Sequence, residues 1–79
     1  GNNMSEMEWL QIFAGNLRYY LEMHGISQNE LAKRSGLEQG SISRYIAAVQ
    51  MPGIKAVVNI SNALGINVDE LINFDTMIY

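Results

Sequence analysis

Glycine and proline recur in this chain at the points where a helical pattern of apolar residues ends. Gly25 follows the first such stretch, Ser35-Gly36 interrupts the second, Pro52-Gly53 precedes the fourth and Gly65 ends it. Glycine tolerates the left-handed conformation of a helix stop, and proline cannot continue a helix. No stretch alternates apolar and polar residues as a half-buried strand does. These positions of glycine and proline, together with the helical spacing of apolar residues, predict an all-α fold, a compact domain of five short helices.

The first helix is expected to span about fifteen residues and to end at Gly25. Apolar residues recur in it at spacings of three and four and predict one buried stripe: Trp9, Ile12, Phe13, Leu17, Tyr20 and Leu21. Residues 1–8 are interpreted as a tag remnant and lead-in, residues 9–73 as the folded domain, and residues 74–79 as an apolar tail.

The same local pattern predicts the starts of the second and fifth helices. Ser27 is a good N-cap with Glu30 three residues later, so each side chain can satisfy a backbone amide of the other residue. Ile26 and Leu31 occupy the positions of a hydrophobic staple. Residues 66–71 repeat this order, from Ile66 and Asn67 to Glu70 and Leu71.

The third helix is expected from Glu38 to Ala47, with Ile42, Tyr45 and Ile46 on its buried face. Leu37, just before it, should dock into the core. The fourth helix should bury a set of aliphatic residues: Ile54, Val57, Val58, Ile60 and Leu64.

The second and third helices have the composition of a helix-turn-helix unit. Ala32 is small, which allows a close helix crossing, and Gly36 lies in the turn, where a positive φ is expected. Leu37 and Ile42 anchor the third helix so that its far face stays outward. Two helices joined by a short glycine-containing turn can hold the second one for insertion into the major groove.

The run from Gly25 to Leu37, Gly-Ile-Ser-Gln-Asn-Glu-Leu-Ala-Lys-Arg-Ser-Gly-Leu, resembles the motif of the Cro and lambda-repressor type of helix-turn-helix proteins, the XRE family. The resemblance continues through Ile42-Ser43-Arg44, Pro52, Ile60 to Leu64 and Asp69-Glu70-Leu71, and it covers about residues 12–73. It implies sequence-specific binding of double-stranded DNA, a transcriptional repressor more than an activator, and a homodimer on a pseudo-palindromic site. Ile46 and Ala48 stand where the family often has Glu and Gly, so the loop at 48–51 is expected to have its own conformation.

The resemblance and the helical geometry together suggest the DNA-binding residues: Gln28, Gln39, Gly40, Ser41, Ser43, Arg44, Gln50 and Lys55. Gln28 would offer its amide to a phosphate and brace a recognition residue. Gln39 can pair with adenine, Ser41 can make less selective contacts, and Gly40 would let the helix approach closely. Arg44 can contact guanine or clamp a phosphate. Gln50 and Lys55 are expected to touch the DNA backbone.

The charge distribution leaves a second function open. The net charge is −3. Residues 24–59 hold four basic and two acidic residues, a balance of +2, whereas the rest holds one arginine and six acids, a balance of −5. A mildly basic middle is compatible with one DNA-facing side. It also suits a protein–protein interaction module on the same scaffold, in which Gln39 and Ser41 are ordinary surface residues and Arg44 pairs with Glu30 or Glu38.

Other chemistry is not expected from this composition. The chain has no cysteine and one histidine, and it shows no nucleophile triad, phosphate loop or metal-ligand cluster. We therefore expect no enzyme, no cofactor, no metal, no small-molecule ligand and no membrane span. The lack of cysteine suits a reducing cytoplasm. The apolar C-terminal part predicts a homodimer contact through Ile72, Phe74, Ile78 and Tyr79.

Overall fold

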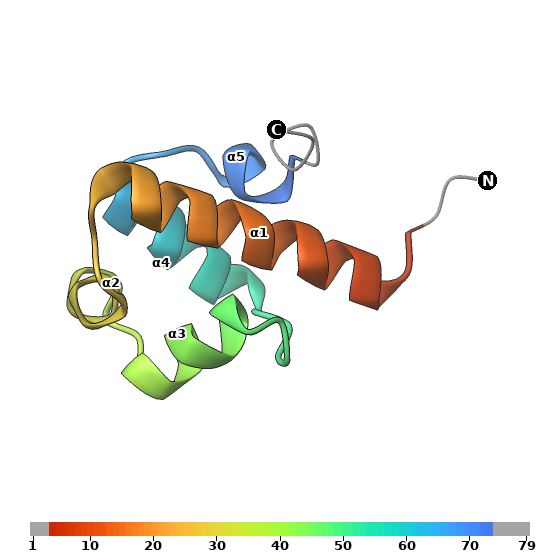
Figure 1. Ribbon diagram of the computed structural model, residues 1–79, viewed down its shortest axis with the longest axis horizontal. Helices are drawn as coiled ribbons and strands as arrows, with labels where there is room; N and C mark the ends of the chain where they lie inside the picture. The colour runs from red at the N-terminus through yellow and green to blue at the C-terminus, as the bar shows by residue number, and fades with distance from the viewer. Residues whose placement is uncertain (1–3, 74–79) are drawn as a thin grey trace.

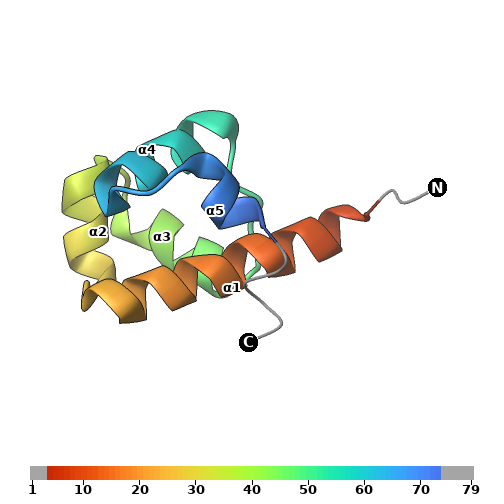
Figure 2. The ribbon, with the colours of Figure 1, turned by 90° about the horizontal axis from the view of Figure 1, so that it is seen from above.

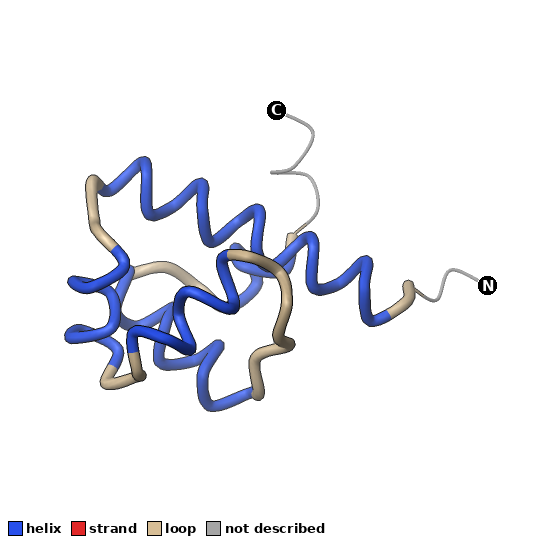
Figure 3. Tube along the Cα trace, turned by 60° about the horizontal axis from the view of Figure 1, so that its bottom comes forward, coloured by secondary structure: helices blue, strands red, loops and turns tan. Residues whose placement is uncertain are grey.

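A computed structural model of the chain describes residues 4–73 as five α-helices joined by short loops. The helices are α1 (Glu6–His24), α2 (Gln28–Ser35), α3 (Gln39–Ile46), α4 (Ile54–Leu64) and α5 (Val68–Ile72). No strand occurs in this range (Figure 3). The all-α class and the five predicted helices are confirmed. None of the helices described is long and apolar enough to cross a membrane.

The longest helix, α1, packs against three of the other four described helices. It packs against α3, α4 and α5, while α2 packs against α3 and α4 (Figures 1 and 2). In Figure 1, α2 is seen nearly along its axis and α3 lies across it, so the two consecutive helices point in different directions. They lie toward the end of the molecule away from the N-terminus of α1.

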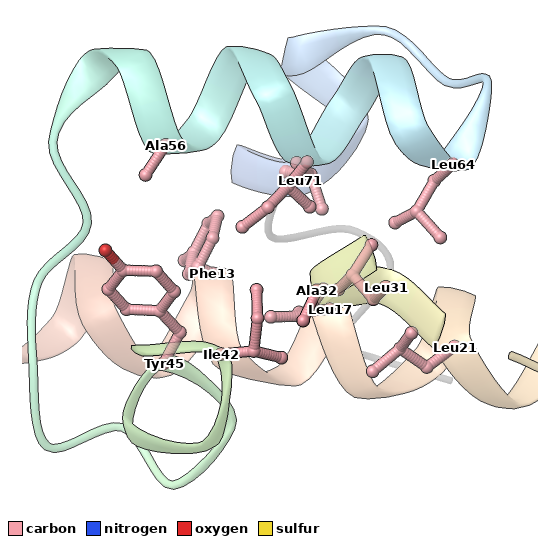
Figure 4. Packing of buried hydrophobic residues seen from close by; sticks show 11 residues of the cluster. Phe13, Leu17, Leu21, Leu31, Ala32, Ile42, Tyr45, Ala56, Leu64 and Leu71 are labelled. Atoms are coloured by element: carbon pink, nitrogen blue, oxygen red, sulfur yellow. The ribbon is translucent and has the colours of Figure 1, made fainter. Parts of the chain in front are cut away.

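A single core joins the five helices. Phe13, Leu17 and Leu21 of α1 face α4, and side chains from the other helices fill the space between (Figure 4). The remaining buried members of the cluster are Leu31, Ala32, Ile42, Tyr45, Ala56, Ile60, Leu64 and Leu71. Leu37 packs against this cluster from the turn before α3, as predicted.

The N-terminus of α1 differs from the sequence-based expectation. The helix is 19 residues long and begins at Glu6, inside the range interpreted as a lead-in. A capping box holds this end: Ser5 Oγ accepts from the Glu8 N–H at 3.2 Å, and the Ser5 N–H donates to Glu8 Oε1 at 3.0 Å. The bonded carboxylate is favoured, so the pKa of Glu8 is below its usual value. The pattern Ser-x-x-Glu was present at residues 5–8 and predicts this cap.

The predicted stripe of α1 is wrong at Trp9, whose side chain is 40% exposed. The first turn of α1 extends beyond the other helices, so none of the described helices packs over it (Figures 1 and 2). Leu10 is the first buried residue, and Ala14 and Asn16 are buried as well. Tyr20 is half-buried and donates its hydroxyl to Glu70 Oε1 on α5 at 3.3 Å. Desolvation and the charge of Glu70 raise the pKa of Tyr20.

The predicted buried face of α4 is wrong at Ile54 and Val58, which are 86% and 39% exposed. Ala56, Ile60 and Leu64 make the buried row at i, i+4 and i+8. At 3.6 residues per turn, Val58 lies about 200° and Ile54 about 240° around the helix from the buried Ile60. A prediction from aliphatic composition alone therefore assigned too many residues of α4 to its buried face.

Two further helix starts use the predicted caps. Ser27 Oγ accepts from the Glu30 N–H at 3.1 Å. The reciprocal half of that box is not formed, and the Glu30 carboxylate accepts from Arg34 Nε at 2.9 Å. At α5, the Asn67 N–H donates to Glu70 Oε2 at 2.7 Å. Phe74, Ile78 and Tyr79 lie outside the described residues.

Candidate nucleic-acid interface

The turn between α2 and α3 is built on Gly36. This residue has φ 73°, in the left-handed region, and its N–H donates to the Ala32 carbonyl at 3.0 Å. Glycine adopts this conformation without the steric cost of a Cβ. The positive φ predicted for Gly36 is confirmed. After the turn, Leu37 is half-buried and Glu38 becomes the N-cap of α3.

Two large side chains hold α3 against the domain. Ile42 is 0% and Tyr45 6% exposed, and the Tyr45 ring meets the ring of Phe13 edge-on, with centroids 6.2 Å apart. Ile46 packs at the margin of the core. With this face buried, the opposite face of α3 is turned to solvent. It carries the predicted site residues Gln39, Gly40, Ser43 and Arg44, all exposed, and the half-buried Ser41.

The first residues of α2 and α3 are in contact. Gln39 Nε2 donates to Gln28 Oε1 at 3.3 Å, across eleven positions of sequence. Gln28 was expected to brace a recognition residue, and the side chain that it contacts is Gln39; the part of Gln39 in recognition stays a prediction. This contact leaves the Gln39 side-chain oxygen as an acceptor and one Nε2 proton as a donor, which is the pair that adenine requires in the major groove.

Arg44 is held by neutral side chains. Its Nε donates to Gln50 Oε1, and its Nη2 donates to Ser41 Oγ at 3.3 Å. The alternative pairing of Arg44 with Glu30 is not formed, because Glu30 is bound to Arg34, and no ion pair with Glu38 occurs within residues 4–73. Gln50 thus joins Arg44 to the loop that follows α3.

Lys55, like Gly40 and Ser43, is a predicted site residue that these side-chain hydrogen bonds do not include. It is exposed in the first turn of α4, and it makes no hydrogen bond or ion pair in the described part of the chain. Its ammonium group is available to solvent on the helix that follows the 47–53 loop.

Arg18 is a basic residue beside α3 that the sequence analysis did not place there. It projects from α1, and its Nη1 donates to the carbonyl of Ile46, the last residue of α3, at 2.7 Å. A cation at a helix C-terminus satisfies a free carbonyl and complements the helix dipole. Arg18 and Ile46 are 28 positions apart in the sequence, and no local sequence pattern predicts a contact between them. Arg18 adds a basic group near α3 that the charge count for residues 24–59 had left out.

The loop after α3 begins with a left-handed residue that is not glycine. Ala48 has φ 58°, whereas the other residues described with positive φ are glycines. The Ala48 N–H donates to the Tyr45 carbonyl and the Val49 N–H to the Arg44 carbonyl, both at 3.1 Å. The sequence predicted that the loop at 48–51 has its own conformation. The structure shows that this loop starts with a regular helix stop, in which alanine takes the left-handed position that glycine usually holds.

The described residues hold no group of three potential metal ligands. A shallow surface hollow lined by Tyr19, Glu22 and Met23 lies on α1, whose side chains there do not belong to the Gln39–Arg44 face.

Comparisons with known proteins agree with this geometry. The family described as helix-turn-helix matches residues 17–71. The restriction-modification controller protein C.AhdI from Aeromonas hydrophila is 27% identical, with a TM-score of 0.76 over 78% of this chain and 94% of that one. A hypothetical transcription factor, NHTF from Neisseria, is 20% identical, with a TM-score of 0.81 over 98% of this chain and 92% of that one, and shows the likeness of fold. No curated protein matches the chain.

Proposed function

This chain belongs to the helix-turn-helix family, and from that premise we propose that it is a sequence-specific regulator of transcription that binds double-stranded DNA. The single observation that carries the proposal is the orientation of α3. Its apolar side, with Ile42 and Tyr45, is buried in the core, and its polar side is exposed along Gln39, Gly40, Ser43 and Arg44. A rigid helix with a free polar face is the element that reads base edges in the major groove.

Exposed positive charges on α2, α3 and α4 support DNA binding. Lys33, Arg44 and Lys55 are exposed, and none of them forms an ion pair within residues 4–73. These groups can neutralise phosphates and release counterions, which gives DNA affinity that falls steeply with salt. Since binding alone can block other proteins from a promoter, we infer repression in preference to activation. A reporter gene behind the selected site should lose expression when the protein is supplied.

The proposal is tested by selection from a random duplex pool at low salt, followed by sequencing of the retained DNA. We expect one motif. Gln39→Ala and Arg44→Ala should each relax the preference at a different position, at a cost of about 1–3 kcal/mol. Lys33→Ala is the matched control on α2, because it removes a charge but should leave the motif unchanged. Recovery of no motif at low salt would refute the proposal.

We also propose a homodimer that uses the C-terminal part. Val68 and Ile72 are 36% and 41% exposed, and their i, i+4 spacing puts them on one side of α5. The apolar residues Phe74, Ile78 and Tyr79 follow in sequence. Sedimentation equilibrium should show a dimer that Ile72→Glu weakens and that Ile54→Glu, a control on α4, leaves intact. A strict monomer at high concentration would contradict this part of the proposal.

The net charge of −3 favours one alternative, a protein–protein interaction module on the same scaffold. The two functions differ in the salt dependence of DNA affinity. A DNA-binding face gives a steep linear fall of log K with log salt, whereas an interaction module gives little binding at any salt concentration.

A further inference from the structure

The guanidinium of Arg44 makes two hydrogen bonds within the domain. It is tied at two points, by the bond from Nε to Gln50 Oε1 and by the bond from Nη2 to Ser41 Oγ at 3.3 Å. One partner lies on α3 itself and the other in the loop after it. Two bonds from different nitrogens define the plane of the group as well as its position.

Gly40 provides the surface over which this group lies. A Cβ built at Gly40 would meet Nη1 of Arg44 at 3.4 Å, and among residues 4–73 it would meet no other atom within 4 Å apart from its chain neighbours and the backbone of its own helix. The φ of Gly40 is not positive, so the backbone does not require glycine here. The guanidinium is therefore folded back over the first turn of α3, and a larger side chain at position 40 would compete with it for that space.

The charge of Arg44 is not neutralised by an acidic partner, and three of its five N–H donors make no hydrogen bond among residues 4–73. Both of its partners are neutral, in contrast to Arg34, which is neutralised by Glu30 at 2.9 Å. Of the five N–H groups of a guanidinium, the two bonds use one on Nε and one on Nη2. Both protons of Nη1 and one of Nη2 are without a partner among residues 4–73. Two adjacent nitrogens with free protons match the N7 and O6 acceptors of guanine.

We propose that Gln50 is a positioning residue, which holds Arg44 so that Nη1 and Nη2 read a guanine in the major groove. This inference rests on the proposed DNA-binding function and gives Gln50 a role other than the backbone contact expected from sequence. The left-handed turn at Ala48 directs the chain so that Gln50 lies within hydrogen-bond distance of Arg44 on α3. The conformation of this loop therefore helps to set the position of the guanidinium. A bond to Nε leaves the end of the guanidinium free, whereas a phosphate clamp needs no such orientation.

The test uses the full chain and the duplex that it selects. Binding is measured to that duplex, to one with 7-deazaguanine at the selected guanine, which lacks N7, and to one with inosine, which keeps N7 and O6. Wild-type protein should lose affinity for the 7-deazaguanine duplex only. Gln50→Ala should reduce this discrimination by roughly two- to tenfold, since ordering of the arginine must then occur on binding. Gln11→Ala, at an exposed glutamine of α1, is the matched control.

A double-mutant cycle shows whether Gln50 acts through Arg44. In the Arg44→Ala background, Gln50→Ala should have no further effect on affinity or on base preference. An equal effect of Gln50→Ala in both backgrounds, or an equal loss on all three duplexes, would overturn the inference. Selection of no motif by the wild-type protein would refute the DNA-binding function itself. A motif that Gln50→Ala leaves unchanged would refute the positioning role alone.

Discussion

Removal of the Asn16 side-chain amide should destabilise the fold more than any surface substitution. Asn16 is 0% exposed on α1, and its Nδ2 donates to the carbonyls of Leu71 and Asn73 at 2.9 Å each. These bonds tie α1 to the end of α5, 55 and 57 positions away. Asn16→Ala loses two hydrogen bonds at about 1 kcal/mol each, and the buried Leu71 carbonyl left without a donor adds about 1 kcal/mol.

The expected total is about 2–3 kcal/mol, a large part of the roughly 4–12 kcal/mol available to a chain of this length. It corresponds to a fall in melting temperature of roughly 10–20 °C. Thermal and urea denaturation followed by circular dichroism measure it directly. Asn62→Ala makes the same chemical change at an exposed position of α4 and should alter stability by less than about 0.5 kcal/mol. If the two variants melt at the same temperature, the structural role given to Asn16 is refuted.

Asn16→Asp sharpens this prediction through its pH dependence. A carboxylate cannot donate to the two carbonyls and is buried without a counter-charge, which costs about 3–5 kcal/mol. Burial raises the pKa of the introduced carboxyl in the folded state above its unfolded-state value of about 4. The free energy of unfolding is therefore highest below that pH, where the carboxyl is neutral, and falls as pH rises through the folded-state pKa. The variant should therefore be least stable at neutral pH. Stability that is independent of pH between acid and neutral conditions would contradict the burial of this group.

Three other predictions concern single contacts. Ala48→Gly should raise stability by about 0.5–1 kcal/mol in urea denaturation, because relief of the left-handed alanine outweighs the extra backbone entropy of glycine; a loss of stability would contradict the strained turn. Ser5→Ala should cost about 1 kcal/mol by removing the α1 cap. Because the pKa of Glu8 is lowered in the fold, its share of that stability is present above the ordinary carboxyl value and disappears as pH falls, and an acid titration of both proteins checks this. The raised pKa of Tyr20 means that its contribution is present below pH 10 and is lost as the phenol ionises above that value, so Tyr20→Phe should flatten the alkaline limb of the stability profile.

Much of the candidate site could be predicted from local sequence. The outer face of α3 followed from Ile42 and Tyr45 at a spacing of three, since residues at that spacing share one side of a helix. The resemblance and the helical geometry predicted that Gln28 would brace a residue of the third helix, and the structure shows a contact with Gln39. The family match over residues 17–71 confirms the resemblance that began at Gly25-Ile26-Ser27.

The partners of the charged side chains could not be predicted in the same way. The sequence left Arg44 able to pair with Glu30 or Glu38, and only the folded chain shows that Glu30 binds Arg34 and that Arg44 binds Gln50. The bond from Arg18 to the Ile46 carbonyl requires α1 and α3 to lie side by side. Such contacts depend on the relative placement of helices, which local spacing does not contain.

The sequence by itself determined where α2 and α5 begin and where α1, α2 and α4 end, because a cap, a staple or a left-handed glycine acts within a few residues of the chain. It also determined that Ile42 and Tyr45 share a face. The tertiary structure alone decided which apolar residues that face is buried against, and why Trp9 and Ile54 are exposed in spite of their composition. The physical reason is that burial depends on whether another helix is present to cover a residue, and that is a property of the packed chain.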